Sequence, residues 1–171
     1  MENLRTQKIA TGGVLLALSV ATLFGATVIP GIELTLYALS SIYVAIAIIE
    51  FTPNTGWLFY FASVLLSFVL VPNKIGLIPY AVFFGIYAIL KYYIERIKKI
   101  NRPLEILLKL IFCNLIFFLS LQFFSAAFTE TIHVPDVALP FIIIGAQVFF
   151  LAYDYLLTLM IGFYLRRRPK A

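Results

Sequence analysis

The chain has 171 residues, of which 63% are hydrophobic, 16% aromatic and 12% charged, and its mean hydropathy is +1.02. A soluble domain carries about 25% charged residues, and a chain of this length has too little interior to bury so much apolar surface. This excludes an ordinary soluble domain, a disordered chain and a nucleic-acid-binding module, and leaves a polytopic membrane protein.

Six apolar stretches approach the length of about 20 residues that a helix needs to cross a bilayer. Pro and Gly interrupt the short connections between them, for example at Pro30-Gly31 and at Pro72. The runs are continuous, whereas a β-barrel would alternate in segments of about ten residues. The sequence therefore predicts an all-α, single membrane domain with helices over about residues 9–29, 34–51, 57–71, 75–94, 104–128 and 137–165.

The second and third stretches are the shortest, and their connection, Thr52 to Gly56, contains no Lys or Arg. Two helices that each cross the membrane are one interpretation of this region. A re-entrant hairpin that enters and leaves on the same side is the other, and the composition of the region is compatible with both.

Basic residues are distributed unevenly over the expected connections. With six spans, both termini lie on one side, and that side holds every Lys and Arg except Lys74. Cytoplasmic loops collect such residues, so this side is expected to be cytoplasmic. The net charge of +5 then reflects orientation and contacts with anionic membrane lipid, with no nucleic-acid partner. The residues concerned are Arg5, Lys8, Lys91, Arg96, Lys98, Lys99, Arg102, Lys109, Arg166, Arg167, Arg168 and Lys170.

Small residues recur every four positions on the first helix, at Gly13, Ala17, Ala21 and Gly25. This spacing is slightly more than one turn, so these residues form one nearly straight strip. Small residues let membrane helices approach closely. The strip therefore predicts a tight helix contact, either inside this bundle or with a second membrane protein.

Ionisable and amide side chains also occur at membrane depth. Asp154 lies about 16 Å from the cytoplasmic end of the sixth helix, and such a residue needs a partner or a wet cavity. Lys109 and Lys91 are the expected partners, in a structural ion pair or in a functional site. Asn114, Gln122 and Gln147 are expected to form interhelical hydrogen bonds or to line a ligand pocket.

Another polar group is expected at the outer ends of the helices. If the helices bundle compactly, these residues converge and are candidates for ligand contact. The alternative is an ordinary belt of aromatic and polar residues at the membrane interface. The residues are Glu33, Tyr37, Asn73, Lys74, Tyr80 and His133.

Catalytic motifs are absent from the sequence. It has no Gly-rich phosphate loop, and a single His, a single Cys and no clustered carboxylates make a metal or two-acid site improbable. We therefore expect a protein that is not an enzyme and holds no metal or cofactor.

The layout and one motif resemble a known family. Six spans, both ends inside and the Ala17-Leu18-Ser19-Val20-Ala21 segment after a short basic start are similar to the substrate-binding membrane subunits (S-components) of energy-coupling factor transporters. In that family, an alanine-x-x-x-alanine motif on the first helix docks onto a coupling subunit that two separate ATPases drive. The resemblance implies that Ala17 and Ala21, flanked by Gly13 and Gly25, contact a coupling subunit. It also implies that the chain captures a small molecule, vitamin-like or a metal ion, near the outer face.

A second family has a similar layout, namely the small rod-shape-determining membrane proteins of bacteria. These act as scaffolds for cell-wall synthesis. The alternative function is therefore a non-catalytic membrane scaffold of an envelope complex.

Overall fold

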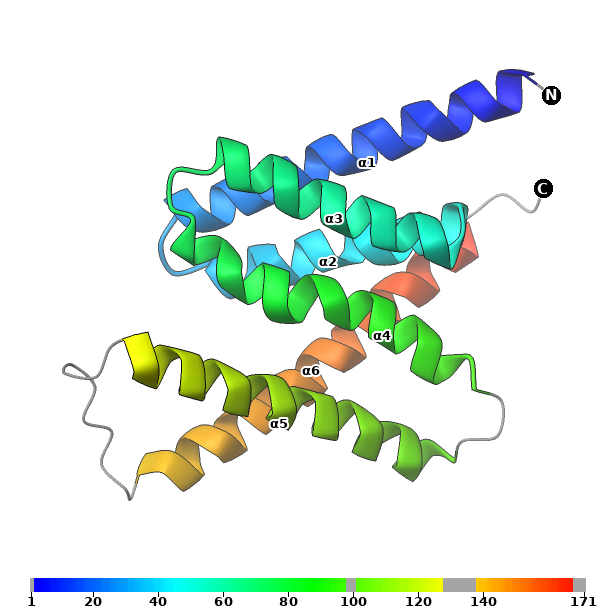
Figure 1. The fold of residues 1–171 in the computed structure, drawn as a ribbon. Helices are drawn as coiled ribbons and strands as arrows, with labels where there is room; N and C mark the ends of the chain where they lie inside the picture. The colour runs from blue at the N-terminus through cyan, green and yellow to red at the C-terminus, as the bar shows by residue number, and fades with distance from the viewer. Residues whose placement is uncertain (1, 98–100, 128–137, 168–171) are drawn as a thin grey trace. The chain divides into compact units, whose positions relative to one another are not determined.

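The computed structural model describes residues 2–97, 101–127 and 138–167, and these residues form helices and no strands (Figure 1). The fold class is all-α, as predicted, and six helical stretches are long and apolar enough to cross a membrane. His133 and the expected helix ends at 128 and 137 lie outside the described residues. The helices are α1 (Glu2–Val28), α2 (Glu33–Glu50), α3 (Pro53–Leu70), α4 (Gly85–Glu95), α5 (Arg102–Ala127) and α6 (Ala138–Arg167).

The connections after α1 and α2 follow from local sequence. Gly31 adopts a φ of +93°, a conformation that glycine tolerates and other residues rarely adopt. The Thr52 side chain accepts a hydrogen bond from the Thr55 amide at 3.2 Å, and Pro53 occupies the first helical position. Helix α3 therefore begins at Pro53, whereas the sequence predicted a connection that extends through Gly56.

Helices α2 and α3 are each 18 residues long. At about 1.5 Å per residue, each measures about 27 Å, close to the thickness of the hydrocarbon core of a bilayer. Their lengths and composition suit full membrane spans, which favours that interpretation over a re-entrant hairpin.

The fourth apolar stretch is not a uniform α-helix. It contains a 3₁₀ turn, η1 (Ile75–Leu77), and a π-helical turn, η2 (Tyr80–Phe84), before α4 begins at Gly85. Together these segments form one candidate span, Ile75–Arg96.

The chain divides into two compact units. Unit 1 comprises Met1–Arg96 and Leu159–Ala171, and unit 2 comprises Ile97–Thr158. The core of unit 1 joins α2, α3 and α4, which lie side by side in Figure 1. Its buried residues are Val44, Ala45, Ala47, Ile48, Phe59, Tyr60, Ala88 and Ile89.

Close contacts between these helices depend on glycine. A Cβ on Gly56 would lie 2.3 Å from Ile48 Cγ1, and a Cβ on Gly85 would lie 2.6 Å from Tyr60 Cε2. Both distances are far below a normal van der Waals contact. The backbones of α3 and α4 therefore approach their neighbours more closely than any other residue would permit.

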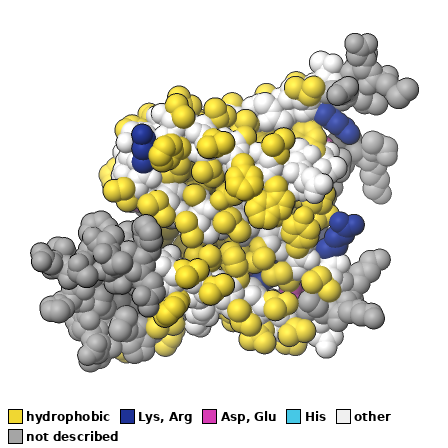
Figure 2. All heavy atoms as spheres, in the orientation of Figure 1, with side chains coloured by type: hydrophobic (Ala, Val, Ile, Leu, Met, Phe, Trp, Pro, Cys, Tyr) yellow, Lys and Arg dark blue, Asp and Glu magenta, His cyan; other side chains and the backbone are white. Residues whose placement is uncertain are grey.

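The described surface is mainly apolar. Figure 2 shows hydrophobic side chains over most of the described part of one face, with Lys and Arg at only a few places. Large side chains such as Leu58, Val69 and Phe141 are at least 70% exposed. A soluble protein rarely exposes so much apolar surface, so lipid is the natural surrounding of these helices.

Candidate functional site

The small-residue strip of α1 lies in an open groove. Gly13, Ala17 and Ala21 are exposed and line a groove of about 590 Å³, with Leu66 and Leu70 of α3 on one side. The remaining lining residues, Leu16, Val20 and Phe24, also belong to α1.

Most of this strip is not covered by any described side chain. A Cβ added to Gly13 would meet no described atom within 4 Å, while a Cβ on Gly25 would lie 3.5 Å from the Leu36 side chain. Gly25 therefore packs partly against α2, whereas Gly13, Ala17 and Ala21 remain uncovered. Packing inside the bundle, one of the two interpretations of the strip, accounts for Gly25.

The expected outward residues gather in part around Gly76. The Tyr37 hydroxyl donates a hydrogen bond to the Gly76 carbonyl, and Asn73 Oδ1 accepts one from the Gly76 amide at 3.2 Å. A Cβ on Gly76 would also meet the Thr27 methyl group at 3.2 Å. We call this group (Thr27, Tyr37, Asn73 and Gly76) the Gly76 cluster. It ties α1, α2 and the segment before η2 together in unit 1.

The other outward candidates have different surroundings. The Glu33 carboxylate accepts a hydrogen bond from the Gly31 amide at 2.9 Å, which closes the turn between α1 and α2. The Lys74 side chain is exposed, and its ammonium lies 4.9 Å from the centre of the Phe68 ring. Tyr80 was expected at the outer end, but its side chain is fully buried.

A buried cluster of hydroxyl groups lies inside unit 1. Ser19 of α1 and Ser40 of α2 are 2.8 Å apart, and Ser63 of α3 lies 3.0 Å from the Tyr80 hydroxyl. Ser19 and Ser40 also lie near the Tyr80 hydroxyl. We call these four residues the hydroxyl cluster, and all of them are fully buried.

The hydroxyl cluster is not evident from the sequence. Serine is common in membrane helices, and nothing in the spacing of these residues marks them. In lipid, such hydroxyls hydrogen-bond across helices because no water is available to them. The cluster therefore connects α1, α2, α3 and η2, and its neutral groups are suited to hydrogen bonding rather than to acid–base chemistry.

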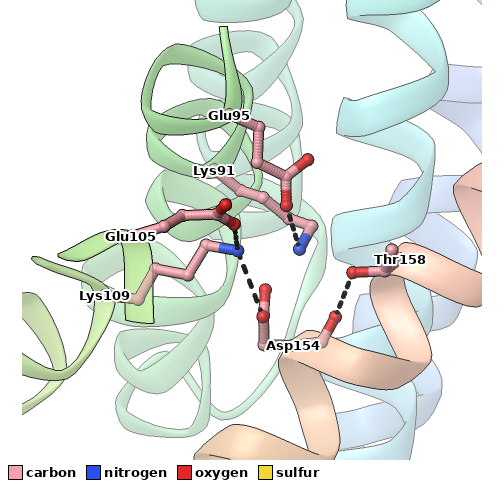
Figure 3. Close-up of polar contacts among 6 residues, drawn as sticks. All are labelled: Lys91, Glu95, Glu105, Lys109, Asp154 and Thr158. Carbon is pink, nitrogen blue, oxygen red and sulfur yellow. Dashed lines mark hydrogen bonds and ion pairs between the residues drawn. The ribbon is translucent and has the colours of Figure 1, made fainter. Parts of the chain in front are cut away.

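Unit 2 contains an ion-pair cluster between α5 and α6 (Figure 3). The ammonium of Lys109 lies 2.7 Å from Glu105 Oε1 and 3.1 Å from Asp154 Oδ2. Lys109 is 3% exposed, so the ammonium is held between carboxylates away from solvent. Lys109 was one of two expected partners of Asp154. The other, Lys91, lies in unit 1 and pairs with Glu95 at 2.6 Å.

Amide side chains form a second polar contact in unit 2. Gln147 Nε2 lies 3.4 Å from Asn114 Oδ1, and the Asn114 amide donates to the Leu110 carbonyl at 2.9 Å. Asn114 and Gln147 thus meet between helices, as one of the two interpretations of the sequence predicted. The side chain of Gln122 lies outside the described residues.

The chain was compared with protein-family models, with curated proteins and with solved structures. No family model, no curated protein and no solved structure matches it.

Proposed function

We propose that the chain is a substrate-capture subunit of an energy-coupling factor type importer in a bacterial cytoplasmic membrane. The observation that carries this proposal is the open groove between α1 and α3, which is lined in part by the exposed Gly13, Ala17 and Ala21. The groove would receive a helix of a coupling membrane subunit. Separate ATPase subunits would drive the cycle.

Membrane physics supports docking at this groove. Lipid tails are as apolar as leucine side chains, so helices in a bilayer associate through close packing rather than through the hydrophobic effect. Gly13, Ala17 and Ala21 have the smallest side chains, and they line a face that the described part of the chain leaves open. A partner helix can therefore approach the α1 backbone here more closely than at the neighbouring Val14 or Leu18.

The distribution of charge supports the proposed orientation. With both termini in the cytoplasm, the ends of α4 and α6 place Arg96, Arg166 and Arg167 on the cytoplasmic side. The Gly76 cluster and Lys74 then lie on the outer side.

The outer side is the proposed place of substrate capture. Glu33, Tyr37, Asn73 and Lys74 are the candidate contacts of a small molecule, together with His133, which lies outside the described residues. Tyr37 and Asn73 already hydrogen-bond to Gly76. A substrate would have to exchange these contacts for its own, so capture would require the Gly76 cluster to open.

One observation favours a second candidate, the non-catalytic scaffold of an envelope complex. Val71, Leu77 and Tyr37 are buried at the Gly76 cluster, so this end of unit 1 is closed by packed side chains. A scaffold needs a docking surface but no ligand pocket. The same groove on α1 would then hold a structural partner.

Co-purification tests the docking proposal. The chain is expressed with the coupling subunit and ATPase pair of its source organism, as wild type and with Ala17→Trp plus Ala21→Trp. The indole rings fill the groove, so we expect recovery of the coupling subunit to fall by about tenfold or more. The matched control is Val14→Trp plus Leu18→Trp, which adds the same rings to exposed positions on α1 outside the groove.

Three results would contradict the proposal: equal recovery with both double variants, equal loss with both, or no association of the wild type. Mass spectrometry of the purified chain separates the two candidate functions. A retained small molecule supports substrate capture. A partner bound through the groove with no small molecule supports the scaffold.

A further inference from the structure

The π turn η2 interrupts the fourth span. The Gly85 amide donates its hydrogen bond to the carbonyl of Tyr80, five residues earlier, instead of to the residue four positions before it. Such a turn inserts one extra residue into an α-helix, and π turns occur frequently at functional sites.

Tyr60 of α3 holds this turn. Its hydroxyl donates a hydrogen bond to the Ala81 carbonyl inside η2. In apolar surroundings, no water is present to satisfy a carbonyl that the α-helical pattern releases. The Tyr60 ring also packs against Gly85, where an added Cβ would lie only 2.6 Å from the ring.

Ser63 completes the contact between α3 and η2. Its hydroxyl donates to the Tyr60 carbonyl at 2.8 Å and lies 3.0 Å from the Tyr80 hydroxyl. Tyr80 is the first residue of η2. Tyr60 and Ser63, both of α3, thus hold the π turn through contacts with Tyr80, Ala81 and Gly85. We call Tyr60 and Ser63 the clamp.

The Gly76 cluster is mechanically linked to this turn. Gly76 precedes Tyr80 by four residues, and the intervening backbone is helical. A shift of one residue in helical register rotates side chains by about 100°. Loss of the extra residue in η2 would therefore turn Tyr80 away from Ser63 and carry Gly76 away from Tyr37 and Asn73.

We infer that η2 is a conformational switch that controls whether the Gly76 end of unit 1 is closed. In the closed state, the clamp holds the π turn, Tyr80 joins the hydroxyl cluster and the Gly76 cluster is formed. In the open state, η2 becomes α-helical and the Gly76 cluster separates. Each state is stabilised by hydrogen bonds that the other lacks. The open state has the regular α-helical hydrogen bonds, and the closed state has the hydrogen bonds from Tyr60 and Ser63 to η2.

Cysteine labelling tests this inference without a known ligand or activity. Leu77 is 3% exposed and lies in η1, so a Leu77→Cys variant in a Cys113→Ser background reports opening of the Gly76 end. The probe is a polar maleimide added to the protein in detergent micelles. Adding Tyr60→Phe removes the hydrogen bond to Ala81, and we expect the labelling rate to rise by about fivefold or more. Ser63→Ala should raise it in the same direction.

Gly56→Ala is the matched control. Its added methyl group would crowd Ile48 in the same unit but removes neither the Tyr60 hydroxyl nor the Ser63 hydroxyl, so it lowers thermal stability while the hydrogen bonds of the clamp are kept. We expect its labelling rate at position 77 to stay at the background value. An unchanged rate with both clamp variants would overturn the switch. So would an equal rise in the Gly56→Ala variant, because the labelling would then report only a general loss of stability.

Discussion

The hydroxyl cluster of unit 1 and the Lys109 cluster of unit 2 accommodate polar groups within apolar helices by different chemistry, although unit 1 also holds the Lys91–Glu95 ion pair. The centre of unit 1 holds the neutral hydroxyl cluster, whereas unit 2 holds Lys109 between Glu105 and Asp154 (Figure 3). Hydroxyls are small and cost little to bury once they are hydrogen-bonded, so they permit close helix packing. Charges are costly at membrane depth and depend on a specific partner. We therefore expect the Lys109 cluster to be sensitive to loss of one charge, and the closely packed helices around the hydroxyl cluster to be sensitive to added volume.

Removing the ammonium of Lys109 should have the largest effect. Lys109→Met keeps the length of the side chain but removes the ammonium that contacts both Glu105 and Asp154. Breaking a buried ion pair by removal of one partner costs about 3 kcal/mol or more. We expect the free energy of unfolding, measured by SDS titration in mixed micelles, to fall by about that amount.

Two further variants place this effect in context. Asp154→Asn should cost less than Lys109→Met, because Lys109 keeps its contact with Glu105. Lys74→Met removes an exposed ammonium that lies over the Phe68 ring, and should cost about 1 kcal/mol or less. If Lys74→Met destabilises as much as Lys109→Met, the buried cluster has no special role in unit 2.

Gly85→Ala should have the next largest effect, because it tests volume rather than charge. The added methyl group would lie 2.6 Å from the Tyr60 ring and 3.2 Å from the Tyr80 carbonyl. Overpacking of this kind costs about 1–3 kcal/mol. The same unfolding measurement should show a loss within that range.

Gly145 and Gly162 provide matched controls for Gly85. A Cβ at either position meets no described atom within 4 Å. Gly145→Ala and Gly162→Ala should leave stability unchanged or raise it by up to about 1 kcal/mol, because alanine is the better helix former. A similar loss in all three variants would mean that helix flexibility, and not packing against Tyr60, explains the effect.

Hydropathy is sufficient to predict the fold class, because a membrane-spanning helix requires a long run of apolar residues. Six apolar stretches are sufficient to identify six candidate spans, and Pro30-Gly31 and Pro72 mark the connections between them. The sequence predicts the start of α3 too late in the chain, because Thr52 and Pro53 are typical of a loop. In fact they are a helix cap and a first helical residue.

The candidate sites were only partly predictable. A charge inside an apolar run is conspicuous, so Asp154 and its partner Lys109 were identified from the sequence. The hydroxyl cluster joins Ser19, Ser40 and Ser63, which lie far apart in the chain and resemble any other membrane serine. The exposure of the small-residue strip also required the fold, because spacing alone does not reveal which face of α1 is covered.

Tyr80→Phe tests the hydroxyl cluster directly and should have a smaller effect. The ring stays in place, but Ser63 loses the hydroxyl that lies 3.0 Å away. A hydrogen bond of this kind contributes about 1 kcal/mol, so the free energy of unfolding should fall by that amount. Tyr155→Phe is the matched control, since Tyr155 is 64% exposed. An equal change in the two variants would show that the cluster adds nothing to stability.

Ser67→Ala should have the smallest effect, with the opposite sign. Ser67 lies one turn after Ser63 on α3 and is fully buried, yet its Oγ has no hydrogen-bond partner among the described residues. A buried polar group without a partner carries a desolvation cost. Its removal should therefore leave the free energy of unfolding unchanged or raise it by up to about 1 kcal/mol. Ser63→Ala deletes the same atom from a bonded position one turn away and should lower stability. If both serine variants lower stability equally, Ser67 also has a hydrogen-bond partner, and hydroxyl pairing in unit 1 extends one turn further along α3.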